Sequence, residues 1–171
     1  MLIKKITPIS FLFLAFPILV FSQPRHVKGM QMGGFIFSNS SSQTTFGVAY
    51  QNYFSNSLSL KCNGFYESIA KQTTSYKNYI INPEALYTVF GNKNSLYLNV
   101  KSGVFAGTGS AKSEIVKENQ AFFGVDLGLS VEMFILPKFK IDLDVDQRFY
   151  QKALFANYRY GYTVSLLYFL N

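Results

Sequence analysis

Apolar and polar residues alternate along residues 121–150. Every second residue from Phe123 to Ile135 is apolar, and glycine, polar or acidic side chains fill most of the positions between them. After a short turn at 136–138, the alternation resumes over residues 139–148. A period of two is that of a β-strand, whose successive side chains point to opposite faces. The stretch is therefore predicted to form a β-hairpin.

The two faces of this hairpin differ in a way that separates two kinds of sheet. The apolar face is unbroken from Phe123 to Ile135, whereas strands of soluble proteins usually span about 5–6 residues. The other face is acidic and contains glycine. A strand that crosses a membrane takes roughly 9–11 residues, with lipid on one side and a wet lumen on the other. The pattern favours a membrane barrel; one long hairpin of a water-soluble barrel is the alternative.

The same alternation recurs along the chain and predicts eight strands. They cover residues 30–37, 44–54, 58–69, 76–90, 95–106, 121–135, 139–150 and 157–170. Short connections at 55–57, 91–94 and 136–138 alternate with longer ones at 38–43, 70–75, 107–119 and 151–156. This order is typical of short periplasmic turns and longer external loops. The predicted fold is all-β: a single eight-stranded antiparallel up-and-down transmembrane β-barrel at residues 29–170.

The strands can be paired about the three short turns so that their apolar faces coincide. The expected partners are Tyr50 and Cys62, Gln51 and Lys61, Tyr87 and Leu98, Glu84 and Lys101, Val131 and Leu143, and Asp126 and Arg148. The pairs Glu84–Lys101 and Asp126–Arg148 are predicted to face each other in the lumen. Glu132 falls opposite Asp142, so either a cation such as Lys140 or Arg159 reaches both carboxylates or one of them is protonated. Pro83 predicts a bulge or an interrupted ladder within its strand.

Residues 1–22 have the features of a secretory signal peptide. Lys4 and Lys5 precede an apolar run at 9–21, and cleavage is expected after Ser22. An uncleaved anchor is the alternative, although the run is short for a spanning helix. Residues 23–28 then form a periplasmic lead-in. The chain is predicted to be exported by the Sec route and to reside in the outer membrane of a Gram-negative bacterium.

Composition excludes several functional classes. The formal net charge is +7, but the lysines are scattered, so direct nucleic-acid binding is not indicated. Cys62 is the only cysteine, which excludes an internal disulfide. His26 is the only histidine and is expected to be solvated in the lead-in, which leaves no histidine for a catalytic group at an external rim. No catalytic residue, cofactor or small-molecule substrate is predicted.

An acidic ladder at Asp142, Asp144 and Asp146 leaves two interpretations, a cation site or a salt-bridged barrel interior. Alternate spacing lines one strand face and does not bring three carboxylates to one point, as a metal requires. No metal site is therefore predicted.

Eight strands leave an interior that side chains fill, so no diffusion pore is predicted, and a partner is met by the loops, the outer wall or the periplasmic end. The basic lead-in suggests the hypothesis that residues 23–29 engage a periplasmic partner, with Arg25 and Lys28 supplying the charge. A disordered terminus without a partner is the alternative.

Two segments resemble a known family. The sequence RHVKG at residues 25–29, and the segment 119–150 with Phe123-Gly124, Glu132, Phe134 and Arg148, look like TraO-type proteins of conjugative transposons. The resemblance implies a non-catalytic outer-membrane component of a conjugative transfer apparatus, in contact with outer-membrane lipid and other envelope proteins. The alternative is a stand-alone small barrel of the OmpA or OmpX type, acting in adhesion or envelope integrity, which shares every feature of the periodicity.

Overall fold

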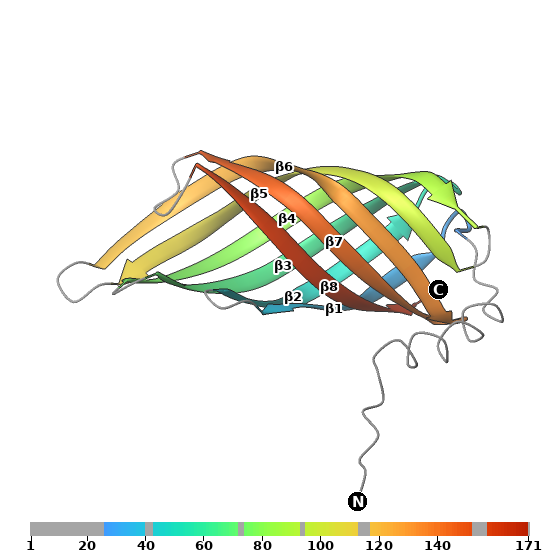
Figure 1. Cartoon of the computed structure of the whole chain (residues 1–171), viewed down its shortest axis with the longest axis horizontal. Helices are drawn as coiled ribbons and strands as arrows, with labels where there is room; N and C mark the ends of the chain where they lie inside the picture. The colour runs from blue at the N-terminus through green and yellow to red at the C-terminus, as the bar shows by residue number, and fades with distance from the viewer. Residues whose placement is uncertain are drawn as a thin grey trace, which may run out of the picture.

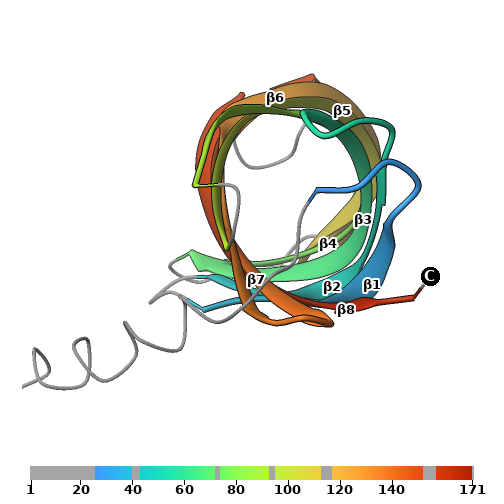
Figure 2. The ribbon, with the colours of Figure 1, turned by 90° about the vertical axis from the view of Figure 1, so that its right-hand side faces the viewer.

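The computed structural model describes residues 26–39, 43–71, 74–92, 95–112, 117–151 and 157–170. Within them, eight antiparallel strands pair in chain order, and the last pairs with the first to close a barrel (Figures 1 and 2). The strands are β1 (Gln31–Asn39), β2 (Gln43–Tyr53), β3 (Leu58–Lys71), β4 (Thr74–Gly91), β5 (Leu96–Lys112), β6 (Lys117–Leu136), β7 (Phe139–Gln151) and β8 (Tyr158–Phe169). The predicted fold is confirmed. The predicted signal peptide lies outside the described residues.

The two faces of the wall are as the alternation predicts. On β6, Leu127 and Leu129 are about half exposed, whereas Asp126, Ser130 and Glu132 are buried inside the barrel. Large outward-facing apolar side chains occur on all eight strands, far more than the scattered apolar residues that a water-soluble surface exposes. An apolar outer wall around a polar lumen is the arrangement of a membrane barrel. None of the described segments is a helix long and apolar enough to cross a membrane.

Two of the three predicted registers are confirmed. Tyr50 faces Cys62 between β2 and β3, and Val131 faces Leu143 between β6 and β7. The register predicted for β4 and β5 is wrong: Glu84 faces Gly103 rather than Lys101.

The cause of this error lies near the turn between β4 and β5. The ladder there begins with Gly91 opposite Tyr97, and it shifts again at an irregularity between Thr88 and Phe90. Tyr87 consequently faces Val100, two positions from the predicted Leu98. A displacement of two leaves each side chain on its predicted face, because the side-chain period of a strand is two. The interrupted ladder predicted at Pro83 is present, since no partner on β5 is paired with Asn82 or Pro83.

The longer loops predicted at 70–75 and 107–119 are wrong, because paired strand continues through most of both segments. β5 runs to Lys112, and β6 begins at Lys117. Gly107 and Gly109 lie in the segment predicted as a loop, but both are beside the ring of Phe122, and a Cβ at Gly107 would come within 2.9 Å of it. These glycines therefore make room for an aromatic ring inside the barrel. The β5–β6 hairpin extends well to the left in Figure 1.

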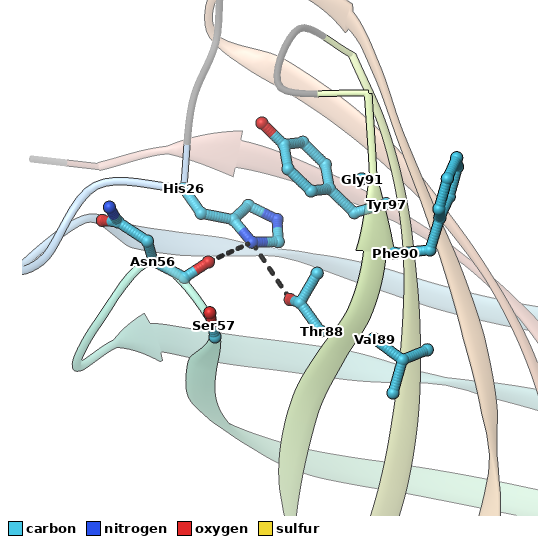
Figure 3. Close-up of a pocket in the computed structure, with 8 residues that line it drawn as sticks. All are labelled: His26, Asn56, Ser57, Thr88, Val89, Phe90, Gly91 and Tyr97. Carbon is cyan, nitrogen blue, oxygen red and sulfur yellow. Dashed lines mark hydrogen bonds between the residues drawn. The ribbon is translucent and has the colours of Figure 1, made fainter.

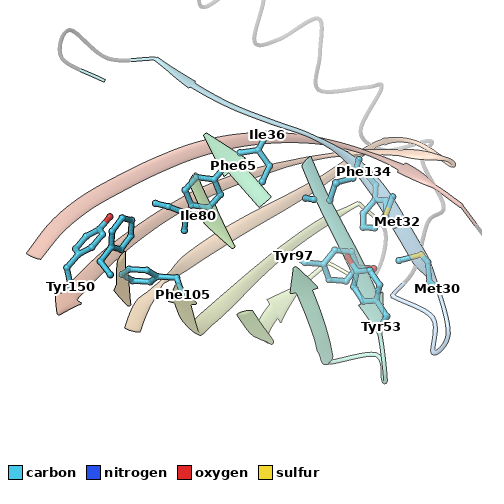
Figure 4. Close-up of a cluster of buried hydrophobic side chains, with 13 residues drawn as sticks. Met30, Met32, Ile36, Tyr53, Phe65, Ile80, Tyr97, Phe105, Phe134 and Tyr150 are labelled. Atoms are coloured by element: carbon cyan, nitrogen blue, oxygen red, sulfur yellow. The ribbon is translucent and has the colours of Figure 1, made fainter. Parts of the chain in front are cut away.

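The barrel has two ends, a proximal mouth and a distal mouth. The proximal mouth carries His26 and the connections 54–57, 92–95 and 137–138, and the distal mouth is the opposite end. Buried apolar side chains gather towards both mouths (Figure 4). The proximal group includes Met30, Tyr53, Tyr97 and Phe134, and the distal group includes Phe65, Ile80, Phe105 and Tyr150. Charged side chains occupy the lumen between them.

Candidate functional site: the charged lumen and its proximal mouth

Charged side chains from β3 to β7 line the lumen. They are Lys61, Glu67, Glu84, Lys101, Asp126, Glu132, Lys140, Asp142, Asp144, Asp146 and Arg148, and all are buried. The strand period places them there, since every second residue points inward. A buried charge is costly unless it is paired and hydrogen-bonded, so the partners of each group determine what the lumen can do.

Opposite charges follow one another in the proximal half of the lumen. The Nζ of Lys140 lies 3.1 Å from Glu132 Oε1 and 3.0 Å from Asp142 Oδ1. The Nζ of Lys61 lies 3.0 Å from Asp142 Oδ2 and 2.8 Å from Asp144 Oδ2. Glu132 and Asp142 face each other across β6 and β7, and Lys140 bridges them, the first of the two outcomes expected for these like charges.

A second set of ion pairs fills the distal half. Lys101 Nζ lies 2.9 Å from Glu84 Oε1 and 3.4 Å from Asp146 Oδ1. The guanidinium of Arg148 lies 2.7 Å from Asp146 and 2.6 Å from Glu67. Glu67 also accepts from Arg159 of β8, at 3.2 Å. Together, the two sets of ion pairs link all six strands from β3 through β8 across the lumen.

The two predicted lumenal pairs have different outcomes. Glu84 and Lys101 form an ion pair although they are not directly opposite, because long side chains on neighbouring strands also meet diagonally. Asp126 and Arg148 are directly opposite, as predicted, but Arg148 turns to Asp146 and Glu67. Asp126 instead accepts a hydrogen bond from Asn82 Nδ2 at 2.7 Å.

The acidic ladder of β7 is occupied by the chain's own cations. Asp142 and Asp144 both contact Lys61, and Asp146 contacts Lys101 and Arg148. The part of the chain that the structure describes holds no group of three or more His, Cys, Asp or Glu side chains that could hold a metal ion. The arrangement is therefore that of a salt-bridged interior.

The expectation that His26 is solvated is wrong. Its side chain enters the proximal mouth and is 5% exposed (Figure 3). The ring stacks on Tyr97 at a centroid distance of 3.7 Å and lies 4.6 Å from the ring of Tyr53. Nε2 lies 2.7 Å from Glu132 Oε2, and Nδ1 lies 3.3 Å from both the Asn56 carbonyl oxygen and Thr88 Oγ1.

A backbone turn holds the lead-in in this position. Gly29 donates from its amide to the Tyr53 carbonyl at 2.7 Å, and Met30 donates to the Val27 carbonyl at 3.0 Å. Gly29 has a φ of +86°, a left-handed conformation that glycine adopts readily. Lys28 is exposed at the turn, while Arg25 precedes the described residues. The hypothesis that Arg25 and Lys28 engage a partner thus concerns residues beside an anchored histidine.

His26 borders a hollow of about 520 Å³ at the proximal rim. It is lined by His26, Asn56, Ser57, Thr88, Val89, Phe90, Gly91 and Tyr97 (Figure 3). A carboxylate, an imidazole and a hydroxyl lie in sequence here, as in hydrolases with a catalytic triad. The Thr88 hydroxyl, however, donates to Asn99 Oδ1 at 2.7 Å, so its proton is not directed at the imidazole. The geometry does not provide an activated nucleophile.

No protein-family model and no curated protein sequence matches the chain. Solved structures of small barrels do match its fold. The N-terminal β-barrel domain of Pseudomonas aeruginosa OprF superimposes with a TM-score of 0.65 at 10% identity, over 84% of this chain and 98% of that one. Neisserial surface protein A has a TM-score of 0.63 at 16% identity, over 81% and 94%.

Ail, the attachment invasion locus protein of Yersinia pestis, has a TM-score of 0.56 at 12% identity, over 84% of this chain and 99% of its own. Identities this low establish similarity of fold alone. The chain is an eight-stranded antiparallel β-barrel of the kind found in OprF, Ail and Neisserial surface protein A.

Proposed function

We propose that the chain is a small, non-catalytic outer-membrane barrel of the OmpA or OmpX type, acting in adhesion or envelope integrity. In this proposal, residues 1–22 direct Sec-dependent export, the proximal mouth faces the periplasm and the distal mouth faces outward. The observation that carries the proposal is the lumen, which cross-strand ion pairs and aromatic rings fill. Because the lumen is filled, contacts with other molecules are made by the outer wall and the two rims.

Charge is distributed unevenly between the lumen and the surface. The sequence has 9 Asp and Glu residues, and seven of them are buried in the described lumen. Outside, Lys77 of β4 and Lys112 of β5 are exposed near the distal mouth, where Lys77 lies opposite Ser110 and Lys112 lies opposite Ser75. The exposed Glu118 of β6 lies at the same mouth, and these three side chains together carry a net positive charge, which attracts anionic groups on other surfaces. Attachment to an anionic surface polymer is therefore the form of adhesion that this rim supports, and Ail is itself described as an attachment protein.

Substitution of the distal lysines tests this proposal. Cells that display the barrel are expected to adhere to an immobilised sulfated polysaccharide, and K77Q together with K112Q should reduce adhesion several-fold. A matched control, K28Q with K138Q, removes the same charge at the proximal mouth and should adhere normally. Equal surface levels and heat-modifiable migration on SDS gels establish that each variant is inserted. Envelope integrity is tested separately by the detergent sensitivity of cells that lack the gene. The proposal is contradicted if the distal variant adheres normally and these cells are no more sensitive to detergent than wild type.

A conjugative role is the second candidate, supported by the resemblance of residues 25–29 and 119–150 to TraO-type proteins. Its partners would be other envelope proteins, reached through Arg25 and Lys28. Transfer genes beside the coding sequence would support it. R25E with K28E in a donor strain tests the contact more cleanly than deletion of the lead-in, which would also remove the anchored His26. Normal transfer frequency with a normally inserted barrel excludes these two residues.

A further inference from the structure

The proximal mouth forms a cage around a single ring. Tyr97 stacks on one face of His26 at 3.7 Å with an interplanar angle of 19°, Tyr53 tilts against it at 4.6 Å, and the edge contact with Phe134 is 6.0 Å (Figure 4 shows these three aromatic residues together). Aromatic faces that surround a flat group favour a cationic occupant, because the ring quadrupole attracts positive charge.

The hydrogen-bonding atoms of the cage favour the same occupant. At Nε2 the partner is a carboxylate oxygen of Glu132, 2.7 Å away. At Nδ1 the partners are the Asn56 carbonyl, which only accepts, and the Thr88 hydroxyl, which gives its proton to Asn99. Both ring nitrogens therefore face acceptors. A neutral imidazole has one N–H and satisfies one side, whereas the imidazolium donates from both.

Formal charge along the proximal half of the lumen gives an independent argument. The contacts run from His26 to Glu132, Lys140, Asp142, Lys61 and Asp144. With every carboxyl ionised, this chain of contacts contains three carboxylates and two ammonium groups, and a positive His26 makes it neutral. The distal ion pairs, formed by Glu84, Lys101, Asp146, Arg148, Glu67 and Arg159, balance one another in formal charge; Asp126, which is held by Asn82, is not one of them.

We propose that the proximal mouth is a binding site for a planar organic cation, and that the chain's own His26, as imidazolium, occupies it and closes the lumen. The titratable or charged groups around the ring are Glu132 of β6, Tyr53 of β2, Tyr97 of β5, and Lys140 and Asp142 of β7. The closure uses both N–H groups of the imidazolium, which face the Glu132 carboxylate and the Asn56 carbonyl. The site does not depend on what the distal rim binds.

The charge of His26 can be read directly, because the chain contains no other histidine. Protein labelled with ¹⁵N-histidine, purified without a histidine tag and folded in micelles, gives one pair of ring nitrogen signals. At pH 6 both nitrogens are expected in the imidazolium range and both coupled to hydrogen. A neutral tautomer at pH 6, with one unprotonated nitrogen, overturns the proposal.

The cage itself is tested by replacing its occupant. In H26A, exchange of the Gly29 amide, which donates to Tyr53, should accelerate about ten- to a hundredfold through loss of a charge-assisted bond. Millimolar imidazole at pH 6 should restore most of the protection, whereas pyrazole, a neutral ring of the same shape, should not. K28A is the matched control, and its exchange should equal that of wild type.

If H26A does not fold, E132Q keeps the histidine and replaces the carboxylate that faces it. The Gly29 amide of E132Q should then exchange faster than that of wild type at pH 6. Equal rescue of H26A by imidazole and pyrazole, or equal exchange of E132Q and wild type at pH 6, contradicts the site. Either result leaves the proposed adhesive function untouched, since that function is measured at the other mouth.

Discussion

Lys140 is a buried cation whose loss should destabilise the barrel. Its Nζ lies 3.1 Å from Glu132 and 3.0 Å from Asp142, and all three side chains are fully buried. At an effective dielectric constant of about 20, each contact corresponds to roughly 5 kcal/mol of gross attraction. Desolvation of the ammonium offsets much of this. Removal of one partner from a buried ion pair typically costs about 3–5 kcal/mol, because the other charge stays buried.

K140M should therefore lower the free energy of unfolding by about 3–5 kcal/mol. The variant keeps the length of the side chain and leaves two facing carboxylates without their bridge. Adding D142N removes one of these carboxylates, and the double variant should regain at least half of the loss. Such coupling is the signature of groups that interact directly.

Urea unfolding in micelles measures these changes, with the fraction folded read from heat-modifiable migration and circular dichroism, because the chain has no tryptophan. K138M is the matched control. Lys138 is exposed two residues away in the β6–β7 turn, so the change should be within about 0.5 kcal/mol. A K140M variant within 1 kcal/mol of wild type would refute the bridging role, as would a double variant no more stable than K140M.

Three further predictions are also tested by urea unfolding, in micelles for D126N and the glycine variants and in lipid vesicles for L127R. D126N should leave stability unchanged or raise it by up to about 1 kcal/mol, because no described ion pair involves Asp126 and its burial cost falls with its charge; a clear loss would contradict this. L127R puts a charge on the lipid-facing wall and should cost about 2–4 kcal/mol in lipid vesicles. G34A should cost about 1–3 kcal/mol, because its Cβ would meet the Leu166 carbonyl where the barrel closes, whereas G64A meets nothing within 3.8 Å and should be close to neutral.

The inward or outward orientation of the side chains could be predicted because it depends on the local alternation of apolar and polar residues. Each strand carries its own inward and outward pattern, so the eight strands, the lumenal side chains and two of the three tested registers follow from neighbouring residues. The third register failed near Thr88 and Gly91, where an irregular ladder and a wider turn leave no mark in the hydrophobic pattern. The prediction that the fifth strand ends before Gly107 was wrong, because glycine occurs in loops and also in strands that pass a large ring, as at Gly107 and Gly109.

The ion-pair partner of each lumenal side chain was harder to predict than its location in the lumen. Arg148 faces Asp126 across the ladder but binds Glu67, which is 81 residues away along the chain. Cross-strand pairing considers one neighbour, whereas a narrow lumen brings side chains from opposite walls within reach of each other. A lumenal cation can therefore pair with carboxylates on strands that are not its neighbours. Which of them it contacts depends on the geometry of the closed barrel.

The lead-in shows the same limit most clearly. RHVKG is short and polar, and in isolation nothing in it predicts burial. His26 becomes buried because Glu132, 106 residues later, lies at the proximal mouth with an oxygen directed at the ring, and because Tyr53 and Tyr97 flank it. The signal available in the sequence was the pair of facing acids, Glu132 and Asp142. Asp142 has two lysine partners, Lys61 and Lys140, whereas Lys140 is the only lysine that reaches Glu132 among the described ion pairs. Glu132 thus has an oxygen left for a group from outside the strand ladder, and the segment that precedes β1 supplies it through His26 Nε2, 2.7 Å away.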